Sequence, residues 1–436
     1  MSLTTRVGLL AGAAALTLSG ISNARPAGEA SNNDTAQRLA AAEAKIAAME
    51  AAQNQNWLTE QRATEIRGLV QDVLADADTR ASLLQTGMTA GYDNGAVISS
   101  SDGNWLVRTN ILLQQRFVYN NADDGGNDGF NSSEYGFETT RAEFILSGHV
   151  VDPTWYYNVR VNVGSEDQSG LIFGYIGKDF GNGLSVQMGA MQSQVAREDI
   201  VTPENQMAIE RSTVVYGFSP GYINGVQVAY TSDKFRVFGQ VSNGSNSNQD
   251  TWQSNDVKYA ISGRGEFLFS GNWDQFKDFT SPRGSEGGMM LGAAAYYQSG
   301  EDNGPIEDID SFLITADFSW EGNGFNLFAS GSWSDTDAVD NNPYGVVVQG
   351  GYYLNDTWEL YGRLEWTNYD IDDVDDLGIV TVGVNKYFAG ANNKISGDFG
   401  YAWNTLPVSV PLTGVRTDVQ ADGGQFIVRF QWQLMF

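Results

Sequence analysis

From about Gly87 to the last residue, apolar and polar side chains alternate along the chain in segments of about ten residues. A strand with this period has one apolar face and one polar face. The final segment is the clearest case: one face carries Phe426, Val428, Phe430, Trp432, Leu434 and Phe436, and the other carries Gln425, Arg429, Gln431 and Gln433. The pattern therefore predicts strands whose two faces meet two different environments.

Sixteen such segments can be counted: 104–119, 136–148, 154–164, 171–178, 184–191, 222–230, 235–242, 257–269, 288–298, 311–320, 325–333, 344–354, 357–369, 378–388, 394–404 and 424–436. Their connections alternate between short turns and long, polar, acidic loops, with 270–287 as a longer member of the short set. This sorting predicts an all-β transmembrane fold, a 16-stranded antiparallel up-and-down β-barrel with both ends in the periplasm. A soluble sandwich or solenoid is the alternative, but it would leave the loop lengths unsorted.

Aromatic side chains near the strand ends support the membrane interpretation, because transmembrane barrels carry an aromatic girdle at each interface. The residues concerned are Trp105, Tyr119, Trp155, Tyr230, Trp320, Trp333, Trp358 and Trp366. A closed barrel also pairs every backbone polar group, as the hydrocarbon core of a membrane requires.

The first 24 residues predict a secretory signal peptide. Arg6 precedes an apolar run over 7–18, and small residues lead to a cleavage site after Ala24. A short buried helix is the alternative. Because no Cys follows the cleavage site, a lipid anchor is excluded.

The segment 25–91 predicts a periplasmic helical region and linker before the barrel, which we place at 92–436. Apolar residues recur at spacings of three and four over 39–49 and again over 66–73, which is typical of a coiled-coil seam. Gln53 and Asn56 interrupt the seam, so a solvated helical linker is the alternative.

Composition and charge exclude several classes of protein. The 436 residues include no Cys and a single His, which excludes a thiolate metal site and any site built from two imidazoles. With 25 basic and 53 acidic residues the net charge is −28, which argues against nucleic-acid binding. We expect no cofactor, and we expect lipid, small solutes and ions as partners.

The loop at 192–221 is too long for a simple hairpin and contains its own apolar residues, so we expect it to fold into the barrel. Its candidate constriction residues are Arg197, Glu198, Asp199, Glu204, Glu210 and Arg211. Strand parity gives candidate pore-wall residues Arg108, Arg116, Arg141, Arg160, Arg236, Arg264, Arg363 and Arg429. Acid facing base would create a transverse field across a constriction. Alternatively, these charges pair with one another and hold the loop in place; both can be true.

The eight long loops contain 27 acidic residues and three arginines, at 197, 211 and 416. Closely spaced carboxylates suit calcium, but the runs lack the spacing of an EF-hand loop. A solvated acidic mouth is therefore the default interpretation, and we assign no metal site.

An enzyme is disfavoured. His149 lies beside a predicted short turn, and no Gly-x-Ser-x-Gly motif accompanies it. A structural role is the second alternative, in which the coiled coil reaches peptidoglycan or a surface layer and tethers the membrane.

Several segments resemble the phosphate-selective porin O and P type family of outer-membrane channels. They are 137–144, 186–192, 210–212, 361–365, 382–388 and 429–433. The resemblance implies a 16-stranded, trimeric diffusion channel whose third loop folds into the lumen, and a terminal Phe436 that looks like the outer-membrane assembly signal. Phosphate-selecting members typically have a Lys where this chain has Gln192, so anion selectivity is not implied. We expect an outer-membrane porin for passive diffusion of small hydrophilic solutes and ions.

Overall fold

The computed structural model describes residues 87–123, 132–164, 170–252, 257–300, 310–336, 341–371, 375–404, 412–417 and 424–436. In the N-terminal segment it describes six helical residues, Gln37, Ala40, Ala41, Glu43, Ala44 and Gly68. The signal peptide at 1–24 lies outside the described residues, as does almost all of the coiled-coil seam. The chain divides into two compact units, 1–86 and 87–436, and the second is described below. No helix in the described ranges is long and apolar enough to cross a membrane.

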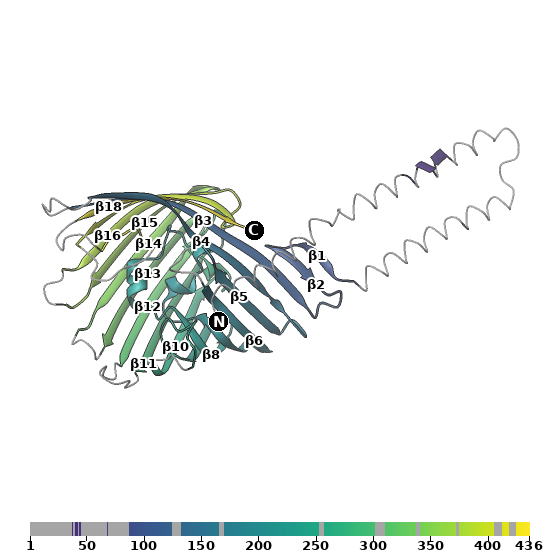
Figure 1. Cartoon of the computed structure of the whole chain (residues 1–436), viewed down its shortest axis with the longest axis horizontal. Coiled ribbons are helices and arrows are strands. Elements are labelled where there is room, and N and C mark those ends of the chain that lie inside the picture. Colours follow the sequence, from purple (N-terminus) through teal and green to yellow (C-terminus); the bar gives the residue numbers. More distant parts are fainter. Residues whose placement is uncertain are drawn as a thin grey trace, which may run out of the picture. The chain divides into compact units, whose positions relative to one another are not determined.

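Residues 106–435 form a closed antiparallel barrel of sixteen strands, which confirms the predicted count (Figure 1). Each strand pairs with the next, and the last pairs with the first from Gln425 opposite Ala122 to Met435 opposite Leu112. The strands are β3 (Leu106–Ala122), β4 (Ser133–His149), β5 (Trp155–Asn162), β6 (Gly170–Gly181), β7 (Leu184–Gln192), β8 (Tyr222–Thr231), β9 (Phe235–Ser242), β10 (Val257–Ser270), β11 (Gly288–Gly300), β12 (Ser311–Gly322), β13 (Phe325–Thr336), β14 (Tyr344–Asn355), β15 (Trp358–Asn368), β16 (Leu377–Tyr387), β17 (Asn393–Trp403) and β18 (Gln425–Met435).

Side chains alternate between an apolar exterior and a polar interior, the inverse of a soluble protein. On β18, Phe430 and Trp432 are 50% and 55% exposed on the outer face, whereas Gln431 is buried on the inner face. This arrangement requires an apolar medium around the barrel, since a continuous belt of exposed aromatic and aliphatic side chains is unfavourable in water.

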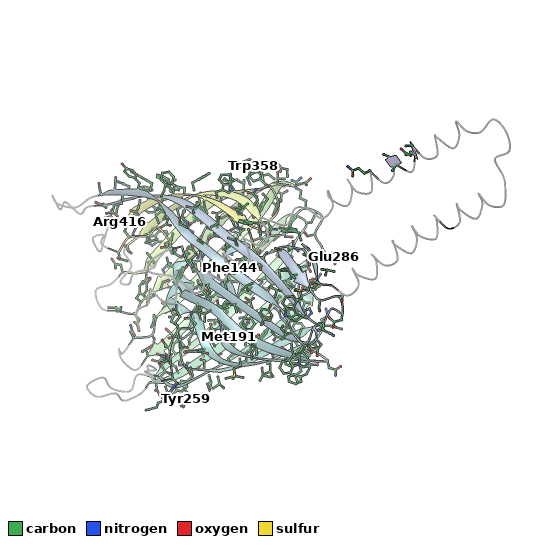
Figure 2. The ribbon with its side chains drawn as sticks, turned by 45° about the vertical axis from the view of Figure 1, so that its right-hand side comes forward. Phe144, Met191, Tyr259, Glu286, Trp358 and Arg416 are labelled. Carbon is green, nitrogen blue, oxygen red and sulfur yellow. The ribbon has the colours of Figure 1, made fainter. Side chains whose placement is uncertain are left out.

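The exposed aromatic residues gather toward the two ends of the barrel. Trp155, Trp320 and Trp358 lie beside the short turns, whereas Tyr259 and Tyr344 lie beside the long loops. Figure 2 shows Arg416, in a long loop, and Glu286, in a short-turn connection, at opposite ends of the barrel. We call these the short-turn end and the long-loop end. Their aromatic side chains match the two interfacial girdles of a membrane barrel.

A β-hairpin that the sequence analysis did not predict precedes the barrel. It consists of β1 (Thr89–Tyr92) and β2 (Ala96–Ser99), so β1 begins inside the expected linker. β2 pairs with β3 from Thr109 to Leu106, directly beyond the point where the backbone of Phe436 pairs with Ile111. The hairpin therefore continues the seam of the barrel past the C-terminus and covers backbone groups of β3 that would otherwise form an open edge.

The described parts of the connections contain four short helices. α4 (Arg197–Ile200), the 3₁₀ helix η1 (Pro203–Asn205) and α5 (Thr213–Phe218) belong to the loop between β7 and β8. The 3₁₀ helix η2 (Gln275–Lys277) belongs to the connection between β10 and β11. Both connections contribute residues to the apolar cluster inside the barrel.

Candidate functional site

The loop between β7 and β8, residues 193–221, lies inside the barrel. Its backbone and side chains form hydrogen bonds or ion pairs with residues on strands all around the wall: β3, β4, β5, β9, β10, β12, β15, β16, β17 and β18. A segment with partners on so many strands of a closed barrel can only cross its lumen. We call it the inner loop.

The inner loop packs one side against an apolar patch of the wall. Val201, Met207, Val214 and Phe218 are buried in a cluster with wall residues of β10–β15, among them Phe328 and Val347. Wall glycines make this approach possible. A Cβ at Gly345 would lie 2.8 Å from Val214 Cγ1, and one at Gly351 would lie 2.5 Å from Met207 Sδ.

Helix α5 is held at its N-terminus by two side chains. Ser212 is its N-cap and accepts a hydrogen bond from the backbone N–H of Val215 at 3.1 Å. The wall carboxylate of Glu365 accepts bonds from the backbone N–H and hydroxyl of Thr213, at 2.6 and 2.8 Å. An anion placed at orphan N–H groups stabilises the start of a helix.

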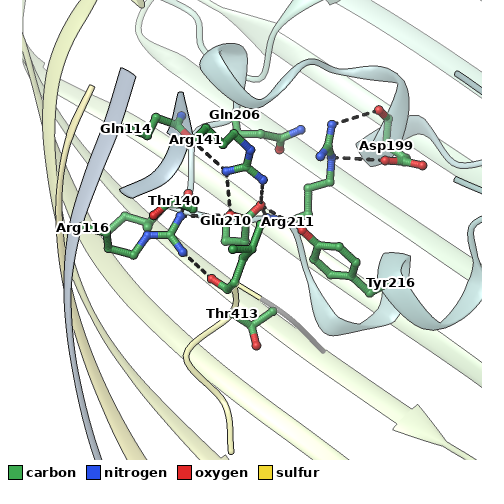
Figure 3. A network of polar contacts seen from close by, with 12 residues as sticks. Gln114, Arg116, Thr140, Arg141, Asp199, Gln206, Glu210, Arg211, Tyr216 and Thr413 are labelled. Carbon is green, nitrogen blue, oxygen red and sulfur yellow. Dashed lines mark hydrogen bonds and ion pairs between the residues drawn. The ribbon is translucent and has the colours of Figure 1, made fainter. Parts of the chain in front are cut away.

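The opposite side of the inner loop is held by buried ion pairs centred on Glu210 (Figure 3). Its carboxylate accepts two bonds from Arg141, both at 2.8 Å, and one from Arg116 at 3.0 Å. The hydroxyl of Tyr216 donates a further bond at 3.2 Å. A β-bulge at Thr140, where the register of β3 and β4 shifts, places Arg141 opposite Gln114 on the inner face.

Two further ion-paired groups connect the inner loop to the wall. Arg160 binds Glu204 of the inner loop at 2.9 Å and also pairs with Glu143 on β4. Arg363 binds Glu365 at 2.8 Å, approaches Glu198 to 3.5 Å and donates to the backbone carbonyl of Glu210 at 2.6 Å. These acids and bases are in direct contact and are not separated by an open gap.

Burial and charge act in opposite directions on the carboxylates of the inner loop. Burial alone would raise the pKa of Glu210 and of Glu204, but their arginine partners outweigh it and hold both pKa values below the ordinary range. For Glu198 burial dominates and raises the pKa, despite Arg363 and Ser212. Glu204 and Glu210 are therefore ionised at neutral pH, as an anchor made of ion pairs requires.

The remaining candidate residues are placed as follows. Arg211 pairs with Asp199 inside the inner loop at 3.4 Å, and Arg264 pairs with Glu266 and Asp317 while donating to the carbonyl of Val195. Arg429 forms a two-bond pair with Asp398 on β17 and donates to Thr413.

Three expected site residues stand apart from the ion pairs that anchor the inner loop. Arg108 pairs with Asp93 of the β1–β2 turn and is partly exposed at the short-turn end. Arg236 pairs with Glu266 and lies 4.2 Å over the ring of Trp273. Arg197 has no carboxylate partner in the described ranges; it donates to the carbonyl of Phe276 and lies over the ring of Phe279, and burial lowers its pKa to about 10.

Residues 271–287 form a second inward segment, whose role the sequence analysis missed. Phe276 and Phe279 are buried, and the ring of Phe279 lies 4.7 Å from that of Phe328 on the wall. The backbone N–H of Phe279 donates to the carbonyl of Asn205, so the segment meets the inner loop. Three aromatic residues in a mostly polar turn, Trp273, Phe276 and Phe279, were the available signal, since apolar residues in a loop also identified the inner loop. We call it the inner turn.

A third segment, 412–417, meets the wall from the long-loop end. The carbonyls of Leu412, Thr413 and Gly414 accept bonds from Arg116, Arg429 and Asn120 respectively. Together the three segments bury nearly all inward side chains at mid-barrel, which leaves a narrow interior.

The sequence model of the family described as "Putative beta-barrel porin-2, OmpL-like" matches residues 157–406, more than half of the chain. No curated protein sequence matches. The residues that contact the inner loop on β5, β10, β12 and β15–β17 all fall within the matched range.

Solved structures of outer-membrane proteins share the fold. The anion-selective porin from Comamonas acidovorans has a TM-score of 0.57 at 14% identity, over 76% of this chain and 99% of that one. The in-vitro folded trimer form of OmpT from Vibrio cholerae has a TM-score of 0.51 at 11% identity, over 75% and 99%. OprB from Pseudomonas putida has a TM-score of 0.50 at 12% identity, over 82% and 96%. At such identities the likeness concerns the fold alone.

Proposed function

Because the chain belongs to the OmpL-like β-barrel porin-2 family, we propose that it works as an outer-membrane porin through which small hydrophilic solutes and ions diffuse passively. The observation that carries this proposal is the inverted barrel. Its apolar exterior suits lipid, its wall carries many inward polar and charged side chains, and a loop folded inside the barrel narrows the interior. The matched family is described as a porin, which favours a channel over an enzyme.

The narrow interior sets the expected size range of the solutes. The inner loop, the inner turn and segment 412–417 bury most wall side chains at mid-barrel. Toward the short-turn end, Tyr156, Asn158 and Gln187 remain only partly buried. A channel of this kind should pass small solutes and reject larger ones, because these three segments occupy part of the lumen.

The ion pairs favour an anchoring role for the constriction charges. Glu210, Glu204 and Glu198 are neutralised by contacting arginines, which weakens any field across the lumen. Any electric field across the lumen then comes from charged side chains that have no ion-pair partner. We therefore propose that the inner loop is primarily a steric filter held by electrostatics.

The finer resemblance to the phosphate-selective O and P type channels rests on the sequence segments quoted above. Gln192 occupies the position of their lysine, and its amide donates to Asp199 and to the carbonyl of Gly221. A neutral side chain committed to these bonds supplies no charge for a phosphate, so we propose no phosphate preference.

We also propose an orientation in the membrane and an oligomeric state for the barrel. Because short turns face the periplasm in outer-membrane barrels, we propose that the N-terminal segment, which the sequence predicts to be helical, lies in the periplasm. OmpT of Vibrio cholerae, which shares the fold, has a trimer form, and we propose a homotrimer for this chain. Contact of the helical segment with peptidoglycan or a surface layer stays a prediction.

Liposome swelling tests the proposal. Vesicles containing the purified barrel should swell in isotonic solutions of small polyols and sugars, at rates that fall steeply as solute size increases. Protein-free vesicles provide the baseline. Swelling rates equal to that baseline for every solute, from folded and inserted protein, would refute the proposal.

A further inference from the structure

A cavity of about 170 Å³ lies at the short-turn end, between the inner loop, the inner turn and the wall. Its lining includes Asp278 and Thr280 of the inner turn, Gln206 of the inner loop, and Tyr353, Tyr387 and Lys394 of the wall. At about 30 Å³ per water, this volume corresponds to roughly six water molecules. It is therefore large enough for a small organic solute.

The cavity is lined by two opposite charges that lack ion-pair partners in the described part of the chain. Lys394 is buried, and its ammonium donates to the backbone carbonyls of Glu204 and Gln206 at 3.2 and 2.6 Å. An ammonium has three N–H donors, so one is left over. Asp278 accepts bonds from the backbone N–H and hydroxyl of Thr280 through Oδ1, and its Oδ2 has no such bond.

Lys394 and Asp278 attract each other, and Lys394 is also attracted to Glu204 and Glu359, but neither charge has a direct ion-pair contact in the described part of the chain. Attraction across a cavity compensates a desolvated charge less well than direct contact does, because Coulomb energy falls with distance. A neutral solute would pair with neither charge, and a simple anion or cation with only one. A zwitterion would pair with both, with its carboxylate at Lys394 and its ammonium at Asp278.

The remaining lining is mixed: it includes Glu204, which is paired with Arg160, and Asn205, together with two tyrosine rings, Pro282 and Ala391. The rings of Tyr353 and Tyr387 stack at 5.6 Å with an interplanar angle of 18°, and the hydroxyl of Tyr387 is fixed by a 2.6 Å bond to Glu359. Such a surface suits a short aliphatic or hydroxyl-bearing side chain.

We propose that this cavity is a binding site for small zwitterionic α-amino acids at the periplasmic exit of the channel. The inference deepens the proposed function, since it names a solute class for the same barrel, but binding and conduction can be measured separately.

Isothermal titration of the full folded chain in detergent tests the site with three ligands of similar size. L-serine carries both charges, L-lactate only the carboxylate and ethanolamine only the ammonium. We expect serine to bind about ten-fold or more tightly than either, because each charge-assisted contact is worth about a decade or more in affinity.

Two variants separate the two charges. Asp278→Asn keeps the oxygen that Thr280 binds but removes the charge, so serine affinity should fall about ten-fold while lactate affinity stays constant. Lys394→Gln should remove the advantage of serine over ethanolamine. Asp274→Asn is the matched control, because Asp274 lies on the same inner turn in an exposed pair with Lys277 and should change nothing.

Heat-modifiable migration on a denaturing gel verifies folding of each variant, and Lys394→Gln decides the question if Asp278→Asn does not fold. Equal affinity for serine and lactate, no measurable serine binding, or an Asp278→Asn variant with unchanged serine affinity would overturn the inference. Serine binding to a barrel that conducts no ions would support the site and refute the porin. Conduction without serine binding would support the porin and refute the binding site.

Discussion

Replacing Glu210 with Gln should loosen the polar side of the inner loop and make the channel noisier and transiently wider. The substitution keeps the shape of the side chain but removes the charge that faces Arg116 and Arg141. Both arginines are buried, so each would lose its main compensating charge without gaining water. Breaking a buried pair in this way costs about 3–5 kcal/mol.

The apolar side of the inner loop determines how far the loosening extends. Val201, Met207, Val214 and Phe218 are buried and contribute about 1.5–3 kcal/mol each, roughly 6–12 kcal/mol together. The loss of the ion pairs is smaller than this sum, so the inner loop should stay attached to β10–β15. A loss of 3–5 kcal/mol raises the fraction of molecules in which residues 204–211 are detached from the wall by about two to three and a half orders of magnitude.

Single-channel recording in planar bilayers measures this directly. The variant should show frequent brief steps to a higher conductance that are rare in the unmodified protein. Asp93→Asn is the control, because it removes an exposed pair with Arg108 that is worth at most about 1 kcal/mol, and its traces should be unchanged. Traces of folded Glu210→Gln that match the unmodified channel would show that the apolar cluster alone fixes the inner loop.

Three other predictions follow from the same contacts. The pKa values of Glu210 and Glu204 are held below their unfolded value of about 4.3, so these carboxylates stabilise the docked inner loop above that pH and lose this effect as the pH falls. Current noise should therefore be constant from about pH 8 to 5 and rise below about pH 4. Noise that rises between pH 8 and 6 would point to other groups. Replacing Phe436, whose backbone pairs with Ile111 at the seam, by Asp should reduce the yield of heat-modifiable barrel and leave single-channel conductance unaltered; normal yield would argue against an assembly role. Replacing the aspartates of one acidic long loop by Asn should lower the cation preference, measured as a reversal potential, in dilute salt only. The Debye length falls from about 10 Å at 0.1 M to about 3 Å at 1 M, so concentrated salt screens the charges of the mouth. An equal effect at 1 M would contradict a solvated mouth. The residues to change are Asp370, Asp372, Asp373, Asp375 and Asp376.

The barrel could be predicted from sequence because its main constraint is local. Every strand must alternate apolar and polar residues, and the connections must sort by length, so both signals survive in a single chain. All sixteen predicted segments coincide with observed strands to within a few residues. The inward position of the inner loop could also be predicted from sequence, since apolar residues such as Ile200 and Met207 in a long loop need a packing partner.

The ion-pair partners could not be predicted, because they depend on how the inner loop crosses the lumen. Parity placed Arg141 on the inner face, but its contact with Glu210, 69 residues away, depends on the bulge at Thr140 and on the path of the loop. Lys394 and Asp278 were missed for the same reason, since they are separated by more than a hundred residues and meet only around a cavity. The β1–β2 hairpin was missed although Asn94-Gly95 between two short runs is a hairpin signal.

Single-channel recording of the unmodified full chain in planar bilayers tests the central proposal most directly, once heat-modifiable migration has shown that the barrel is folded. A porin whose lumen is narrowed by the inner loop and the inner turn should insert to give discrete steps of uniform, small size. The current through each step should be proportional to voltage. Folded barrel that demonstrably inserts into the bilayer and yet gives no steps at any voltage would contradict the proposed function.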